Sequence, residues 1–116
     1  MQDQDFDARS ELMKKWQLAV PEDEDAPNEQ ELLLRALKRR VLYLLEHNFD
    51  KLINALYRLD AAEQATQEAF GLRKPDAVAE ALSHIILARE LQKMRSRYQR
   101  QQELDRSGQQ IKSGES

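Results

Sequence analysis

Apolar residues recur along most of the chain at the three- and four-residue spacing of amphipathic helices. In the first such segment, at about residues 7–20, the apolar side chains fall within about 120° of a helical wheel. They are Leu12, Met13, Trp16, Ala19 and Val20. Because a helix this short is marginal alone in water, we expect it to dock on its own domain or on a partner.

The second segment, from Asn28 to about His47, carries apolar residues over more than half of its wheel. A surface helix needs a stripe of only about 100°. We therefore expect this helix to be covered from at least two sides. Asn28 and Glu31 have the spacing of an N-cap and its N3 partner, which marks the start of the helix.

Two shorter helices are predicted next. Asp50 can cap the first of them, and its apolar positions are Leu52, Ile53, Leu56 and Leu59. Asp60 followed by Glu63 repeats the capping arrangement and predicts a short, alanine-rich helix that ends near Phe70. An alanine face allows a neighbouring helix to approach closely.

The last pattern predicts a long helix from Pro75 to about Glu103. Proline suits the first helical position, where its missing N–H is not needed. A helix of about 28 residues is about 42 Å long. A compact domain of this size is only about 30 Å across, so we expect the helix to project beyond it.

The apolar stripe of this long helix changes sides. Its first half presents Val78, Leu82, Ile85 and Ile86 on one face, and its second half presents Leu87, Leu91, Met94 and Tyr98 on the opposite face. A helix that serves one core keeps one face. The second half is therefore expected to pack on the N-terminal helix or on another subunit, and we predict a homodimer through residues 87–98. Trp16, Leu87, Leu91, Met94 and Tyr98 are the predicted interface residues.

These patterns predict an all-α fold, a bundle of four or five helices with a long C-terminal helix. Residues 1–27 are expected to form an acidic N-terminal arm with a short amphipathic helix and a Pro-bounded linker. Residues 28–104 would form the helical domain. Residues 105–116 are rich in Ser, Gly, Gln and Lys, which predicts a disordered tail.

Composition supports the helical prediction. The chain has 116 residues, which is enough for one small domain, and only three glycines and three prolines, too few for a many-stranded β fold. It contains no cysteine, which excludes disulfide scaffolds and zinc–thiolate sites. The N-terminal stretch has neither the basic nor the apolar region of a signal peptide, and no apolar run is long enough to span a membrane. We therefore expect a cytoplasmic protein without membrane contact.

Charge is unevenly distributed along the chain. The net charge is −3, yet residues 1–34 carry ten acidic groups and three basic ones, while residues 35–116 have an excess of basic groups. An acidic arm can dock on a basic body or keep anionic partners away from it. The simpler interpretation is a solvated arm.

Candidate catalytic and metal-binding residues are sparse. Neither His47 nor His84 has a metal-ligand spacing, and no glycine-rich loop could hold a phosphate. No serine is accompanied by a base at a recognisable spacing. We therefore expect neither enzyme activity nor a cofactor.

Basic residues gather on the last predicted helix, around Tyr98. They are Arg89, Lys93, Arg95, Arg97, Arg100 and, just beyond, Arg106. Arginine and lysine can neutralise phosphates, and a tyrosine can stack on a base. Glu90, Glu103 and Asp105 dilute this basic character. We expect a non-enzymatic protein-interaction or structural protein that self-associates, and nucleic-acid binding through residues 89–106 is the alternative.

Three stretches, LYLLEHNFDKL at 42–52, LYRLD at 56–60 and IILARELQK at 85–93, resemble a family of short, all-helical bacterial proteins of uncharacterised function. The resemblance implies a bacterial origin and supports the helical prediction. The triplet at 56–58 also matches the LYR-motif proteins, which carry it near the start of their first helix. Here the triplet lies in mid-chain, so we attribute that match to coincidence.

Overall fold

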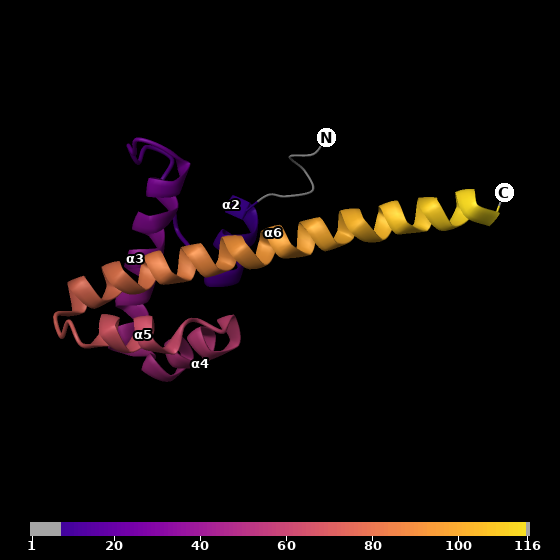
Figure 1. Ribbon diagram of the computed structural model, residues 1–116. Helices are drawn as coiled ribbons and strands as arrows, with labels where there is room; N and C mark the ends of the chain where they lie inside the picture. The colour runs from indigo at the N-terminus through magenta and orange to yellow at the C-terminus, as the bar shows by residue number, and fades with distance from the viewer. Residues whose placement is uncertain (1–7, 116) are drawn as a thin grey trace.

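The computed structural model describes the backbone of residues 8–115 and the side chains of residues 8–106. All the regular structure in this part of the chain is helical, which confirms the predicted all-α class (Figure 1). The helices are α2 (Ala8–Trp16), α3 (Glu29–His47), α4 (Phe49–Leu59), α5 (Glu63–Phe70) and α6 (Pro75–Glu115).

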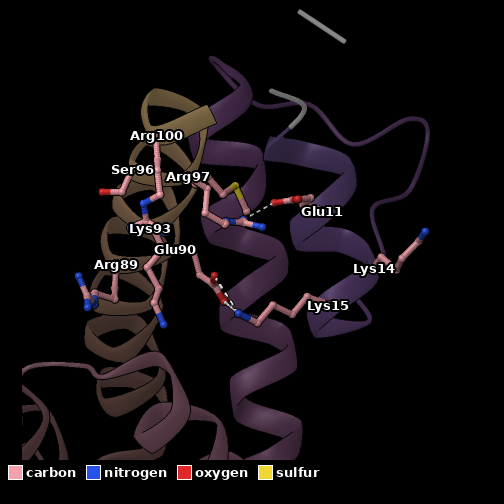
Figure 2. A pocket seen from close by; sticks show the side chains of 10 residues that line it. Glu11, Lys14, Lys15, Arg89, Glu90, Lys93, Ser96, Arg97 and Arg100 are labelled. Atoms are coloured by element: carbon pink, nitrogen blue, oxygen red, sulfur yellow. Dashed lines mark hydrogen bonds and ion pairs between the residues drawn. The ribbon is translucent and has the colours of Figure 1, made fainter. Parts of the chain in front are cut away.

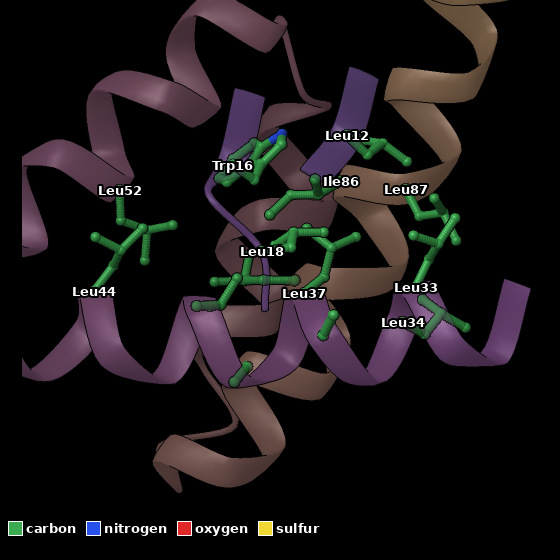
Figure 3. Close-up of a cluster of buried hydrophobic side chains, with 14 of the residues drawn as sticks. Leu12, Trp16, Leu18, Leu33, Leu34, Leu37, Leu44, Leu52, Ile86 and Leu87 are labelled. Carbon is green, nitrogen blue, oxygen red and sulfur yellow. The ribbon is translucent and has the colours of Figure 1, made fainter. Parts of the chain in front are cut away.

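The core forms where α6 crosses α3, the most extensive contact among the described helices (Figure 1). Leu37 and Val41 of α3 and Leu82 and Ile86 of α6 are fully buried there. The other helices pack around this crossing, and buried leucines from α2, α3 and α4 join the same cluster (Figure 3). The strongly apolar helix α3 is therefore covered from several sides, as the width of its apolar surface predicted.

The junctions on either side of α4 differ from the predicted caps. Asn48 both ends α3 and begins α4, and its side chain accepts a hydrogen bond from the Lys51 backbone N–H. Asp50 therefore lies inside the first turn and does not cap it. Asp60 ends α4 in the left-handed conformation, at φ 60°, instead of opening the next helix. The cap spacing failed here because aspartate also tolerates this left-handed conformation at a helix end.

The first helix is part of the core, not a separate arm. Leu12 of α2 is fully buried and Trp16 is 5% exposed, since α2 packs on both α3 and α6. The helix ends at Trp16, earlier than predicted, because Gln17 takes a positive φ and the Leu18 N–H donates to the Met13 carbonyl. Residues 1–7 of the expected arm lie outside the described residues.

The last helix is longer than predicted. It continues without interruption from Pro75 to Glu115 and projects well past the other helices (Figure 1). The predicted end near Glu103 rested on where the helical pattern stops, and the predicted tail at 105–116 rested on composition. Gly108 and Gly114 both lie within α6, but a glycine inside a helix costs only about 1 kcal/mol, and no proline follows Pro75 in the sequence. The side chains beyond Arg106 lie outside the described residues.

Candidate functional site

A groove of about 660 Å³ runs between α2 and the middle of α6 (Figure 2). Its walls come from two segments that are far apart in the sequence. The lining residues are Glu11, Lys14, Lys15, Arg89, Glu90, Lys93, Met94, Ser96, Arg97 and Arg100. Basic side chains dominate this set, so the groove is cationic.

Helical spacing explains how α6 supplies four cations to one wall. Arg89, Lys93, Arg97 and Arg100 follow one another at three- and four-residue intervals, which places them on one face. These are four of the five residues predicted to contact nucleic acid. The fifth, Arg95, is exposed but does not line the groove.

The Glu90 carboxylate is buried beside the groove and links α6 to α2. Its residue is 2% exposed. It accepts a hydrogen bond of 2.7 Å from the Trp16 indole Nε1, and the Lys15 ammonium lies 2.9 Å from it. Burial of a charge is costly unless it is paired and hydrogen-bonded, so these two donors are what allow the carboxylate to remain here.

This role of Glu90 was not predicted from the sequence, where the residue counts only as a dilution of the basic patch. A clue was present in the sequence. Glu90 lies three residues after Leu87 and four before Met94, on the apolar face of the helix, where a charged residue needs a specific partner. The indole N–H of the only tryptophan supplies that partner.

Other polar contacts fix the cations that line the groove. Arg97 pairs with Glu11 at 2.9 Å and forms a second bridge between α6 and α2. The Arg89 Nε donates to the Leu59 carbonyl at 3.0 Å, near the C-terminal end of α4. Cations are favourable near a helix C-terminus, where carbonyl groups lack helical partners. Two of the cations that line the groove, Arg89 and Arg97, are therefore held in place by neighbouring groups.

The charge of the groove is positive after this pairing. Six basic and two acidic residues line it, which leaves a formal excess of four positive charges. Glu90 is matched by Lys15 and Glu11 by Arg97, and Arg89 lies 3.4 Å from the carboxylate of Asp60, which is outside the lining. Within the described part of the chain, no ion pair or hydrogen bond is found for the side chains of Lys14 and Arg100. These cations can turn to an anionic ligand.

The predicted interface residues are mostly covered within the protomer. Trp16, Leu87 and Met94 are 5%, 3% and 4% exposed, and Leu91 and Tyr98 are half-buried. The second half of the long helix was expected to pack either on the N-terminal helix or on another subunit. In the structure it packs on the N-terminal helix, α2. A second subunit is therefore not needed to cover this half of α6, since α2 folds back over it and contributes Leu12 and Trp16 to the same cluster.

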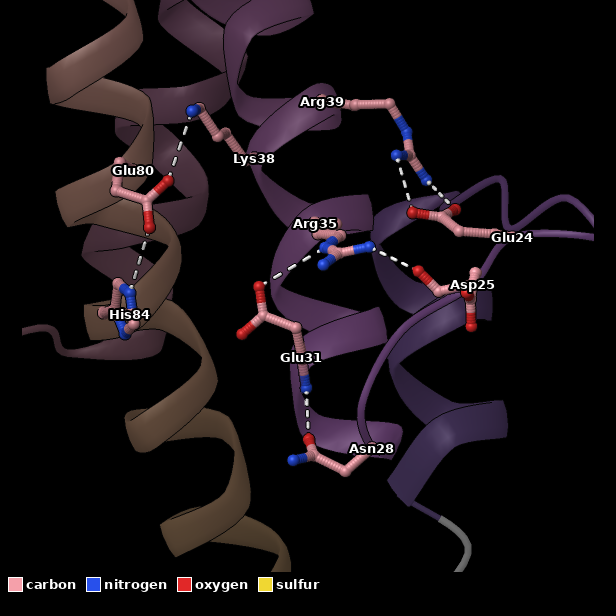
Figure 4. A network of polar contacts seen from close by, with 9 residues as sticks. All are labelled: Glu24, Asp25, Asn28, Glu31, Arg35, Lys38, Arg39, Glu80 and His84. Carbon is pink, nitrogen blue, oxygen red and sulfur yellow. Dashed lines mark hydrogen bonds and ion pairs between the residues drawn. The ribbon is translucent and has the colours of Figure 1, made fainter.

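A second polar network joins α3 to the linker that precedes it and to α6 (Figure 4). Arg39 holds Glu24 at 3.0 Å, and Arg35 donates to the Asp25 carbonyl, so the acidic linker is docked on α3. Lys38 reaches α6 and pairs with Glu80 at 3.2 Å.

Two pKa values shift in this network. Hydrogen bonds to Asp76 and then to Glu80 raise the pKa of Lys38 above its ordinary value of 10.5. The hydrogen bond from Lys38, and a weaker one with His84, lower the pKa of Glu80 below its ordinary value of 4.5. Because all these groups are at the surface, the pairs act as modest stabilisers of the α3–α6 contact.

Among residues 8–106, no three histidine, cysteine or acidic side chains come together as metal ligands would. None of the helices in the described part of the chain combines the length and the apolar character needed to cross a bilayer. Comparison with protein-family models, with curated proteins and with solved structures gave no match. The resemblance to short helical bacterial proteins therefore stays a prediction, and the groove has to be interpreted from its own residues.

Proposed function

We propose that the groove between α2 and α6 binds the phosphate backbone of nucleic acid, and that the protein is a non-enzymatic nucleic-acid-binding protein. The observation that carries the proposal is the excess of four positive charges in one groove of a chain whose net charge is −3. Lysine and arginine side chains that neutralise phosphates release counterions, which drives such binding without regard to sequence.

The shape of the site favours a polymer over a small anion. From Arg89 to Arg100 the cations extend along eleven residues of α6, or about 16 Å of helix. Successive phosphates of one strand of a duplex rise about 3.4 Å along the duplex axis, so a strand that runs beside α6 places several phosphates within this length. Arginine also presents a planar fork of donors that suits phosphate oxygens.

Self-association through residues 87–98 is less well supported as the function. Three of its five proposed contact residues already pack inside the protomer. A protein-interaction role needs a different surface, and nucleic-acid binding does not depend on it.

The test is fluorescence anisotropy with labelled single-stranded and duplex oligonucleotides of arbitrary sequence. We expect binding at low salt, with a slope of log affinity against log salt of about −3 for a single strand that contacts four cations. Between 50 and 200 mM salt, that slope corresponds to a loss of about fiftyfold in affinity.

Two double variants distinguish the effect on affinity of charges that line the groove from the effect of charges elsewhere on α6. Lys93→Gln with Arg100→Gln removes two charges from the groove, and we expect affinity to fall about tenfold and the salt slope to become shallower by about 1.4. Arg95→Gln with Arg106→Gln removes the same charge from the same helix outside the groove and serves as the control. The absence of binding by the wild type at low salt, or equal losses in the two variants, would contradict the proposal.

A further inference from the structure

The outer face of α4 carries an apolar stripe that the described helices leave largely exposed, although the Phe49 ring meets the Phe70 ring of α5 edge-on at 5.8 Å. Phe49, Ile53 and Tyr57 succeed each other at four-residue intervals and are 47%, 37% and 85% exposed. They are half of the six large hydrophobic residues that are exposed in the described part of the chain. Such a cluster on one helix face is typical of an interaction site.

The stripe is not a by-product of burying the other face of α4. Leu52, Leu56 and Leu59 point into the core and are at most 5% exposed, so the helix is already anchored. Beside the stripe, a groove of about 750 Å³ separates α4 from α5, and Ile53 and Tyr57 form one of its walls. An apolar helix face next to a groove can receive another helix.

The charges beside the stripe indicate what that helix is. Asp50 lies in the first turn of α4 and Arg58 in its last turn, and both line a groove on the flank of the helix next to the stripe, together with Asn54. Within the described residues, neither side chain has an ion pair or hydrogen bond. Opposite charges at the two ends of one helix are self-complementary when two copies of that helix run antiparallel.

We propose that α4 pairs antiparallel with α4 of a second copy of the chain, around a two-fold axis near Asn54. The two-fold axis brings the same flank of both helices together, so Asp50 faces the partner subunit's Arg58, and the same pair forms again at the other end. Phe49 lies near the partner subunit's Tyr57, which covers the stripe. A parallel pair would leave both charges unmatched. This interface shares no residue with the α2–α6 groove, so it is independent of the nucleic-acid proposal.

Analytical ultracentrifugation over a concentration series tests the interface. An interface built on one helix and its groove is small, so we expect a dimer that dissociates at about micromolar concentrations. The wild-type mass then rises from 13.6 kDa towards twice that value. Asp50→Arg alone and Arg58→Asp alone each place like charges opposite one another and are expected to give monomers. The double variant, Asp50→Arg with Arg58→Asp, restores opposite charges and is expected to restore the dimer.

Two controls complete the design. Tyr57→Ser should dissociate the dimer, whereas Tyr43→Ser changes a tyrosine that is 52% exposed on α3 and should leave the mass unchanged. Circular dichroism melts check that each variant is folded. A wild type that stays monomeric at every concentration, single variants that remain dimeric, or a double variant that stays monomeric would each overturn the proposal.

Discussion

Replacement of Trp16 by phenylalanine tests whether the buried carboxylate of Glu90 is what holds α2 on α6. The substitution keeps an aromatic ring at the position but removes the indole N–H. The carboxylate, in a residue that is 2% exposed, then loses its 2.7 Å hydrogen bond. Its other donor, Lys15, has a side chain that is 56% exposed and lies at the edge of the groove.

The magnitude follows from the kind of bond that is lost. A hydrogen bond to a charged group contributes about 1.5–3 kcal/mol to stability. The Trp16→Phe variant also removes a little apolar contact, so we expect it to lower the free energy of unfolding by about 2–3 kcal/mol. For a domain of this size, that change corresponds to a decrease in Tm of about 10 °C.

A double-mutant cycle isolates the bond itself. Glu90→Met alone leaves the buried indole N–H without an acceptor, whereas Trp16→Phe with Glu90→Met removes both polar groups. Because a pair of apolar replacements can be nearly neutral, the double variant should be less destabilised than the sum of the single variants by about 1.5 kcal/mol or more.

Urea unfolding followed by far-ultraviolet circular dichroism is the suitable assay, because Trp16 is the only tryptophan and its fluorescence is lost in the variant. Lys15→Met is the control. It removes the exposed donor but keeps the indole hydrogen bond, so it should destabilise the protein by less than Trp16→Phe does. A Trp16→Phe variant within about 0.5 kcal/mol of the wild type, or additive single changes, would refute the reasoning.

Two further predictions concern the α3 helix and its contact with α6. Leu44 is 2% exposed and Leu45 is half-buried. Leu44→Ala should therefore lower the free energy of unfolding by about 2–5 kcal/mol and Leu45→Ala by clearly less, and equal losses in urea unfolding would show that the burial is misassigned. Because the pair with Lys38 lowers the pKa of Glu80, its stabilising effect is complete above pH 4.5 and is lost as the pH falls through the lowered value. The wild type should therefore melt slightly above Glu80→Gln at pH 7, and the difference should vanish in acid; a difference that stays the same as the pH is lowered would contradict this assignment.

Local patterns predicted the helices well because helical periodicity is a local property. The apolar spacing placed α3, α4, α5 and the start of α6 close to their observed positions, and Asn28 caps α3 as expected, accepting a hydrogen bond from the Glu31 N–H at 2.8 Å. Element ends were less predictable. Asp60 fits both a helix start and a left-handed helix end, and only the path of the chain around it decides between the two.

Only the α6 side of the candidate site could be predicted from the sequence. The four cations on one face of α6 could be listed from their spacing alone, since residues on one helix keep fixed relative positions. Lys14 and Lys15 could not be joined to them, because nothing local places residue 15 beside residue 90. The exposure of the α4 stripe could not be predicted from the sequence either, since an amphipathic pattern does not show whether another element covers a given face of the helix.

The sequence by itself determined that this chain is helical, where its helices lie and that the apolar stripe of its last helix changes sides. Tertiary structure alone decided how that second stripe is covered. The Trp16 indole hydrogen-bonds to the Glu90 carboxylate, 74 positions further along the sequence, and this contact holds α2 over α6 within the same protomer. Periodicity specifies which residues must be buried, whereas the partner that buries them depends on how the chain folds back on itself.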